Sequence, residues 1–175
     1  MGCYTALEPM GDPGVDDTRV PLELLRHALA TLAYRGGKAV RGAPDAFGAF
    51  HLSATSRTPV QILAHIGDLL DWAWALARGA EAWHNSPPLA WPDEVSRFYD
   101  ALARLDAQLA GHGLVNVRVE ELLQGPIADA LTHVGQLTLM RRLSGSPIRG
   151  ENYLRADIAS GRVGPEQVPP KGEFE

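Results

Sequence analysis

The chain has 175 residues, of which 45% are hydrophobic and 21% are charged, and this composition is typical of a single globular domain. Its formal net charge is -5, and its 16 basic residues are scattered. This argues against nucleic-acid binding and membrane-surface binding, which need clusters of lysine and arginine. No apolar run approaches the roughly 20 residues that span a bilayer. Because the N-terminus also lacks a signal-peptide pattern, we expect a cytoplasmic protein.

The N-terminal segment contains glycine and proline at short intervals, so we expect residues 1–17 to form a loose leader. It holds Cys3, the only cysteine, which excludes a disulfide within the chain and argues against a cysteine-based metal site. We expect a single helical domain over residues 18–164. A polar tail should follow over residues 165–175.

The first helix is predicted to begin after Thr18, because apolar residues follow at the spacing of one helical face. These residues are Leu22, Leu25, Leu29, Leu32 and Ala33. The pair Gly36–Gly37 is expected to stop this helix. A long connection over residues 38–56 should follow, with a short helix over residues 45–50.

The second helix has the clearest start, because Thr58 is a good N-cap residue and Pro59 suits the first helical position. We expect it to continue to about Ala80. Residues 84–88 contain Asn, Ser and two prolines and predict a loop. A third helix should begin near Pro92–Asp93, and Gly111 and Gly113 should end it.

The last long helix is predicted to start after Gly125–Pro126 and to run from Ile127 to about Leu143. The preceding residues 115–123 suit either a short strand or a turn of helix. A short helix is expected over residues 152–160. Four amphipathic segments with few strand signals predict an all-α fold, an up-down four-helix bundle with a long connection between its first two helices.

Three polar side chains lie on or beside the predicted apolar faces of these helices. His65 falls close to the apolar stripe of the second helix, and Asp129 and His133 are spaced i, i+4 on the fourth. Two imidazoles and one carboxylate would hold a divalent metal ion and leave positions open for water or a substrate.

The same residues also have a purely structural interpretation. A histidine beside an apolar stripe is often a hydrogen-bonded core residue, and an Asp–His pair at i, i+4 is often a weak surface interaction. Spacing alone does not decide between the two. The histidines at positions 27, 51, 84 and 112 are expected to be surface residues.

Two segments carry a resemblance to a known family, residues 58–68 (TPVQILAHIGD) and residues 125–137 (GPIADALTHVGQL). Residues 141–147 and 151–153 continue it. With these segments the chain resembles the DinB/YfiT-like superfamily of bacterial four-helix-bundle proteins. The resemblance covers roughly residues 58–164.

This resemblance implies a metal site with one histidine on the second helix and an HxxxH pair on the fourth. His65 and His133 match that pattern, whereas Asp129 stands where histidine is commonest. The carboxylate remains a sound ligand for zinc, nickel, manganese or iron. The resemblance implies nickel or zinc as the usual metal, a homodimer, and a low-molecular-weight thiol as a substrate of an S-transferase or isomerase.

Two functional hypotheses follow. The first is a divalent-metal-dependent, thiol-using enzyme, and the second is a non-catalytic helical bundle for ligand binding or dimerisation. Trp72 and Trp74 bear on assembly, because residues two apart on a helix point in nearly opposite directions. One of them should therefore contact either a long loop or a partner subunit, and we expect a symmetric dimer.

Overall fold

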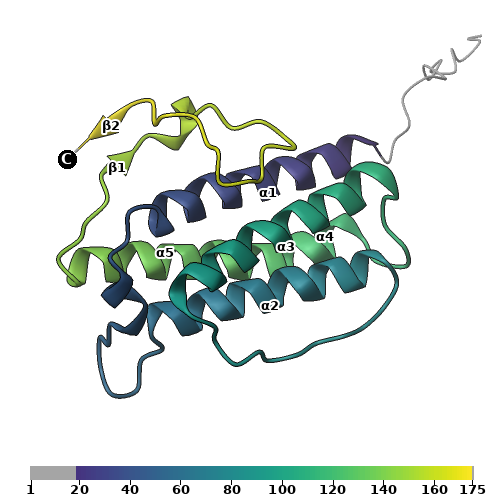
Figure 1. Ribbon diagram of the computed structural model, residues 1–175. Coiled ribbons are helices and arrows are strands. Elements are labelled where there is room, and N and C mark those ends of the chain that lie inside the picture. The colour runs from purple at the N-terminus through teal and green to yellow at the C-terminus, as the bar shows by residue number, and fades with distance from the viewer. Residues whose placement is uncertain (1–18, 175) are drawn as a thin grey trace, which may run out of the picture.

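The computed structural model describes residues 19–174, so the expected leader and Cys3 lie outside the described residues. The prediction of a mainly helical chain is confirmed (Figure 1). The long helices are α1 (Arg19–Val40), α2 (Pro59–Ala77), α3 (Trp91–Gly111) and α5 (Ala128–Leu143), and the short α4 is Val119–Leu122. The remaining elements are 3-10 turns at Asp45–Ala49 and Tyr153–Arg155, a π-helical turn at Leu123–Ile127, and the strands β1 (Gly150–Glu151) and β2 (Glu173–Phe174).

The long helices lie side by side, and each packs against two others. Both α1 and α2 contact both α3 and α5, so the four helices surround one core. Its largest fully buried side chains are Leu25, Leu29, Leu32, Leu63, Ile66, Leu70, Phe98, Leu102, Leu105, Leu122, Ile127 and Leu137. Burial of these apolar surfaces is the main stabilising contribution to the fold.

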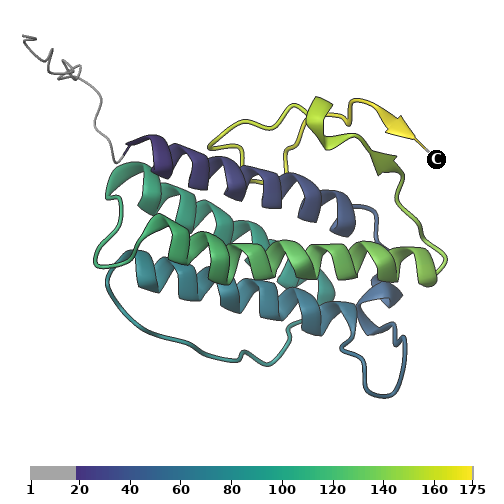
Figure 2. The ribbon, with the colours of Figure 1, turned by 180° about the vertical axis from the view of Figure 1, so that it is seen from behind.

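Helices α2 and α3 run in the same direction (Figures 1 and 2). Where α2 ends, the main-chain oxygen of Ala77 accepts a hydrogen bond from Val115, which follows the end of α3. Where α3 begins, the ring of Trp91 packs on Phe47, which precedes α2, with 5.3 Å between centroids. The predicted up-down alternation is therefore wrong for this connection.

The parallel arrangement is possible because the connection over residues 78–90 runs back along the whole of α2 (Figure 2). The 19 residues of α2 span about 28 Å. An extended chain of the length of this connection reaches roughly 40 Å, which is enough. The connection therefore covers one side of α2.

The start of α2 is as predicted. The Thr58 hydroxyl accepts a hydrogen bond from the Gln61 main-chain nitrogen, and the Gln61 side chain accepts one from Thr58 in return. This reciprocal pair satisfies two donors that the first helical turn would otherwise leave unpaired.

The predicted end of α1 is wrong, because the helix continues through Gly36 and Gly37 to Val40. A Cβ atom at Gly36 would lie 2.6 Å from the ring of Phe98, and one at Gly37 would lie 2.6 Å from the hydroxyl of Tyr99. The two glycines therefore allow α3 to pack closely on α1. Close packing between helices therefore explains the two glycines, which do not end the helix.

The bounds of the last helix are as predicted within one residue, because α5 is Ala128–Leu143. The expected break before it is absent: helical structure begins at Val119 and continues through a π-helical turn, Leu123–Ile127, directly into α5. Pro126 lies within this turn. Proline has no N–H group and clashes in a regular α-helix, and the wider π-helical turn accommodates it. Residues 119–122 thus form a turn of helix, one of the two alternatives.

The C-terminal region forms less helix than expected, because residues 152–160 contain only the turn Tyr153–Arg155. The segment after Gly164 folds back, and β2 pairs antiparallel with β1. Lys38 of α1 lies 2.8 Å from a carboxylate oxygen of Glu151 and 2.6 Å from one of Glu173, so it ties both strands to the helices. Among the described residues, no helix has the length and apolarity needed to cross a membrane.

Candidate metal centre

The three side chains predicted for the metal site come together between α2 and α5. His65 Nε2 lies 3.6 Å from Asp129 Oδ2, and His133 Nδ1 lies 3.1 Å from Asp129 Oδ1. The two imidazole rings have 4.7 Å between their centroids. One ligand atom from each residue lies within 4.8 Å of the other two.

Helix packing holds these side chains at the edge of the core. On α2, the neighbours of His65 are the buried Ala64 and Ile66. On α5, Ala130 and Val134, each one residue after a site residue, are buried too. The side chains of His65 and His133 are 17% and 12% exposed, and that of Asp129 is 45% exposed. The two imidazoles are thus mostly buried, and the carboxylate is exposed to solvent.

Main-chain geometry orients the ring of His133. Its Nδ1 lies 2.9 Å from the main-chain oxygen of Asp129. Because a carbonyl oxygen only accepts hydrogen bonds, Nδ1 carries the proton and donates it. In the neutral ring, Nε2 then keeps its lone pair for an ion. Metal-binding histidines in proteins are usually fixed in this way.

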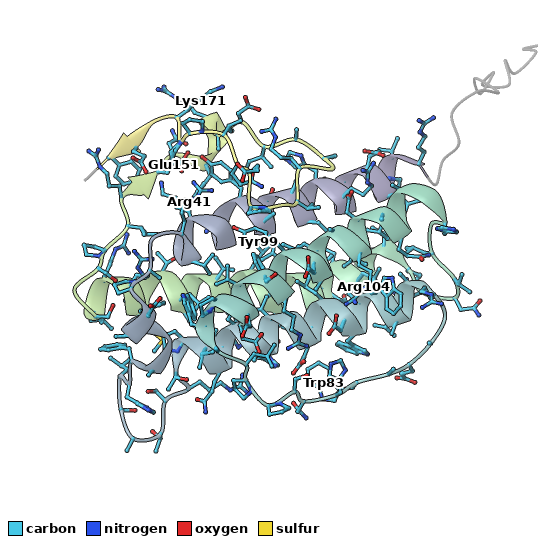
Figure 3. The ribbon with its side chains drawn as sticks, in the orientation of Figure 1. Arg41, Trp83, Tyr99, Arg104, Glu151 and Lys171 are labelled. Atoms are coloured by element: carbon cyan, nitrogen blue, oxygen red, sulfur yellow. The ribbon has the colours of Figure 1, made fainter. Side chains whose placement is uncertain are left out.

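The surroundings of His65 favour its neutral form. Burial lowers the pKa of His65, the charges of His133 and Arg57 lower it further, and Asp129 only partly opposes them. The indole of Trp83 packs edge-on against the His65 ring, with 5.8 Å between centroids. Trp83 lies on the connection over residues 78–90 (Figure 3). Neutral imidazole is the form that binds metal ions.

The donor set suits a divalent ion. Ligand atoms bound at about 2.0–2.2 Å from one ion lie about 3–4 Å from each other. The 3.6 Å between His65 Nε2 and Asp129 Oδ2 falls in this range. Among residues 19–174, the only ionic contacts of Asp129 are those with His65 and His133, so no lysine or arginine competes for its charge. Two histidines and a carboxylate suit zinc, nickel, manganese or iron.

Sequence reasoning missed a second cluster, in which His84 meets Asp68 and Asp71. His84 Nε2 lies 3.2 Å from Asp68 Oδ1 and 3.5 Å from Asp71 Oδ2. The 78–90 connection runs back along α2 and so brings His84 to these carboxylates. The residues next to His84 in the chain carry no signal that predicts this contact. Arg97 bonds to both carboxylates, and Arg104 bonds to Asp71.

These ion pairs indicate that the second cluster has a structural role. Two arginines already balance the two carboxylates, so a metal ion would have to displace them. Asp68 also accepts a hydrogen bond from the main-chain nitrogen of Ser86, at 2.9 Å. We therefore assign this cluster to anchoring the 78–90 connection on α2.

The tryptophan pair on α2 makes its second contact within the chain. Trp72 packs on Trp83 of the long connection, with 5.6 Å between ring centroids. Trp74 faces the guanidinium groups of Arg78 and Arg104, at 4.3 Å and 4.9 Å. The long-loop alternative accounts for the pair. The tryptophan pair therefore gives no support to the expected dimer, which stays a prediction.

Comparisons with models of protein families, with curated proteins and with solved structures found no match. The resemblance to DinB/YfiT-like proteins therefore stays a prediction that rests on the two sequence segments. Independent support for a site comes from the convergence of His65, Asp129 and His133.

Proposed function

We propose that this protein is a divalent-metal-dependent enzyme of the DinB/YfiT type, a four-helix bundle in which His65, Asp129 and His133 hold the ion. One observation carries the proposal. Three ligand atoms of the right chemistry lie within 4.8 Å of one another, and no lysine or arginine among the described residues pairs with the carboxylate.

The proposed substrate is a low-molecular-weight thiol, and the proposed reaction is S-transfer or a thiol-dependent isomerisation. Three protein ligands leave coordination positions open. A bound divalent ion supplies Lewis acidity, which lowers the pKa of a coordinated thiol and favours the nucleophilic thiolate.

The residues of the chain contribute to this chemistry by orienting and surrounding the ion. The main-chain oxygen of Asp129 orients the His133 ring, and the Asp129 carboxylate offsets part of the charge of the ion. Trp83 packs edge-on against one side of the His65 ring. We propose nickel or zinc as the metal, with manganese or iron as alternatives. A cytoplasmic homodimer is proposed from the resemblance alone.

Cobalt substitution tests the proposal. Protein loaded with Co²⁺ should show visible absorption of a bound ion, and 2-mercaptoethanol should then add a sulfur-to-cobalt charge-transfer band. An alcohol of equal size, such as 1-propanol, should add none. Cobalt binding without the new band would contradict the thiol substrate. Absence of any bound cobalt would favour the alternative of a non-catalytic bundle.

A further inference from the structure

A cavity of about 420 Å³ opens beside His133, between the segment that precedes α2 and the C-terminal half of α5. His133 is part of its wall, so the cavity adjoins the proposed metal centre. Arg57 and Ser56 line it from the segment before α2, and Gln136 lines it from α5. A molecule in this cavity would lie against one of the proposed metal ligands.

Aliphatic side chains form much of the wall. They are Leu52, Ile62, Leu139 and Met140. Leu52 and Leu139 are 52% and 50% exposed, although both are large and apolar. A ligand that covers them would remove apolar surface from water, which favours binding by a molecule with an aliphatic body.

Arg57 is the cationic group of the wall. Among residues 19–174, no carboxylate lies within ion-pair distance of its guanidinium, whereas Arg26, Arg97 and Arg104 all pair with aspartates. An unpaired guanidinium at an apolar cavity is suited to a carboxylate or another anionic oxygen group.

We propose that this cavity binds a small molecule with an aliphatic body and an anionic oxygen group, and that Arg57 anchors the anion. The proposal that the cavity binds this molecule depends only on the residues that line the cavity. The assignment of this molecule as a substrate of the adjoining centre rests on the proposed function. Gln136, which also lines the cavity, supplies amide N–H groups that suit the same oxygen atoms.

A matched set of probes tests the proposal. Hexanoate, 1-hexanol and hexylammonium share an aliphatic chain and differ in the charge of the head group. Each is titrated into chelator-treated protein and into zinc-loaded protein, and the backbone amide resonances of Ile62, Gln136 and Met140 are followed by NMR. Hexanoate should bind about tenfold more tightly than hexanol, the difference expected from one charge-assisted hydrogen bond. Hexylammonium should bind most weakly.

Two variants identify the anchor. Arg57→Gln should remove the preference for hexanoate over hexanol. Arg142→Gln removes the same charge from an exposed residue of α5 that does not line the cavity, and it should leave the preference unchanged. Equal binding of hexanoate and hexanol to the unaltered protein would overturn the proposal. If Arg57→Gln still preferred hexanoate over hexanol as strongly as the parent, the proposal would also be overturned. That result would include the case in which bound zinc, and not Arg57, holds the carboxylate.

The two forms of the protein separate this inference from the proposed function. Selective hexanoate binding that depends on Arg57, in a protein that takes up no zinc, would uphold the cavity and refute the metal centre. Zinc uptake without selective hexanoate binding would uphold the metal centre and refute the ligand class.

Discussion

The main-chain oxygen of Asp129 accepts a hydrogen bond from Nδ1 of His133, 2.9 Å away and one helical turn later. The same Nδ1 also lies 3.1 Å from the Asp129 carboxylate, but the bond to the backbone of α5 remains when that side chain is changed. A change at position 129 should alter one ligand and leave the other in place. This makes the Asp129 carboxylate an independently testable part of the proposed centre.

Asp129→Asn should weaken zinc binding by about a hundredfold, because a neutral amide replaces the only anionic ligand. Asp129→His supplies an imidazole at the position where the resembled family has one, and it should retain affinity within about tenfold of the original. Isothermal titration with Zn²⁺ measures both. Equal affinity of the Asn variant and the parent would show that the carboxylate is no ligand.

Asp68→Ala should destabilise the protein without affecting its metal content. Asp68 is 2% exposed, and its loss removes the acceptor for Ser86 and one partner of Arg97. We expect a cost of about 2–3 kcal/mol in the free energy of unfolding, measured by urea denaturation. Limited proteolysis should become faster within residues 78–90. A loss of bound zinc in this variant would show that our separation of the two clusters is wrong.

Glu151 should make the protein sensitive to acid. Burial opposes ionisation of Glu151, but bonds from Lys38 and Tyr34 more than offset it, so the pKa of Glu151 lies below its ordinary value of 4.5. A carboxyl group with a lowered pKa in the folded state stabilises the protein above the unfolded pKa, and this contribution is lost as pH falls through the folded pKa. Stability should therefore fall below about pH 4.5.

The variant Glu151→Gln is the comparison for that prediction. It should be less stable than the parent at neutral pH, and its free energy of unfolding should change less between pH 6 and pH 3. Urea titrations at several pH values measure the difference. Parallel curves for the two proteins would mean that Glu151 does not contribute to the acid sensitivity.

Gly36→Ala should destabilise the protein by about 1–3 kcal/mol, because its new methyl group would meet the ring of Phe98 in a packed interface. Gly135→Ala is a matched control. It lies inside α5, is exposed, and has no atom within 4 Å of the added Cβ. It should stabilise the helix by up to about 1 kcal/mol. Thermal melting compares the two, and similar effects would contradict the close packing of α1 on α3.

Local signals in the sequence predicted much of this structure. The start of α2 followed from Thr58 and Pro59, because capping depends on residues within one turn of helix. The juxtaposition of Asp129 and His133 followed from their i, i+4 spacing. Their meeting with His65 depended on helical periodicity, which placed all three near the apolar faces.

The errors came from contacts between residues distant in the sequence. Gly36 and Gly37 look like a helix stop, and only the rings of α3 show why they lie within a helix. Gly125–Pro126 looks like a helix start, but both residues lie within the π-helical turn that joins α4 to α5. The second cluster was missed because His84 reaches Asp68 only through the parallel course of α2 and α3.

The central claim is that His65, Asp129 and His133 hold one divalent ion, and metal content measures it most directly. The protein is purified without chelator or affinity metal, dialysed against zinc or nickel, freed of unbound ion and analysed for its elements. Parent and His84→Ala should each hold about one ion per chain, whereas His133→Ala should hold less than about a tenth and remain folded by circular dichroism. Equal metal content in the parent and a folded His133→Ala protein, or metal loss in His84→Ala alone, would contradict the assignment.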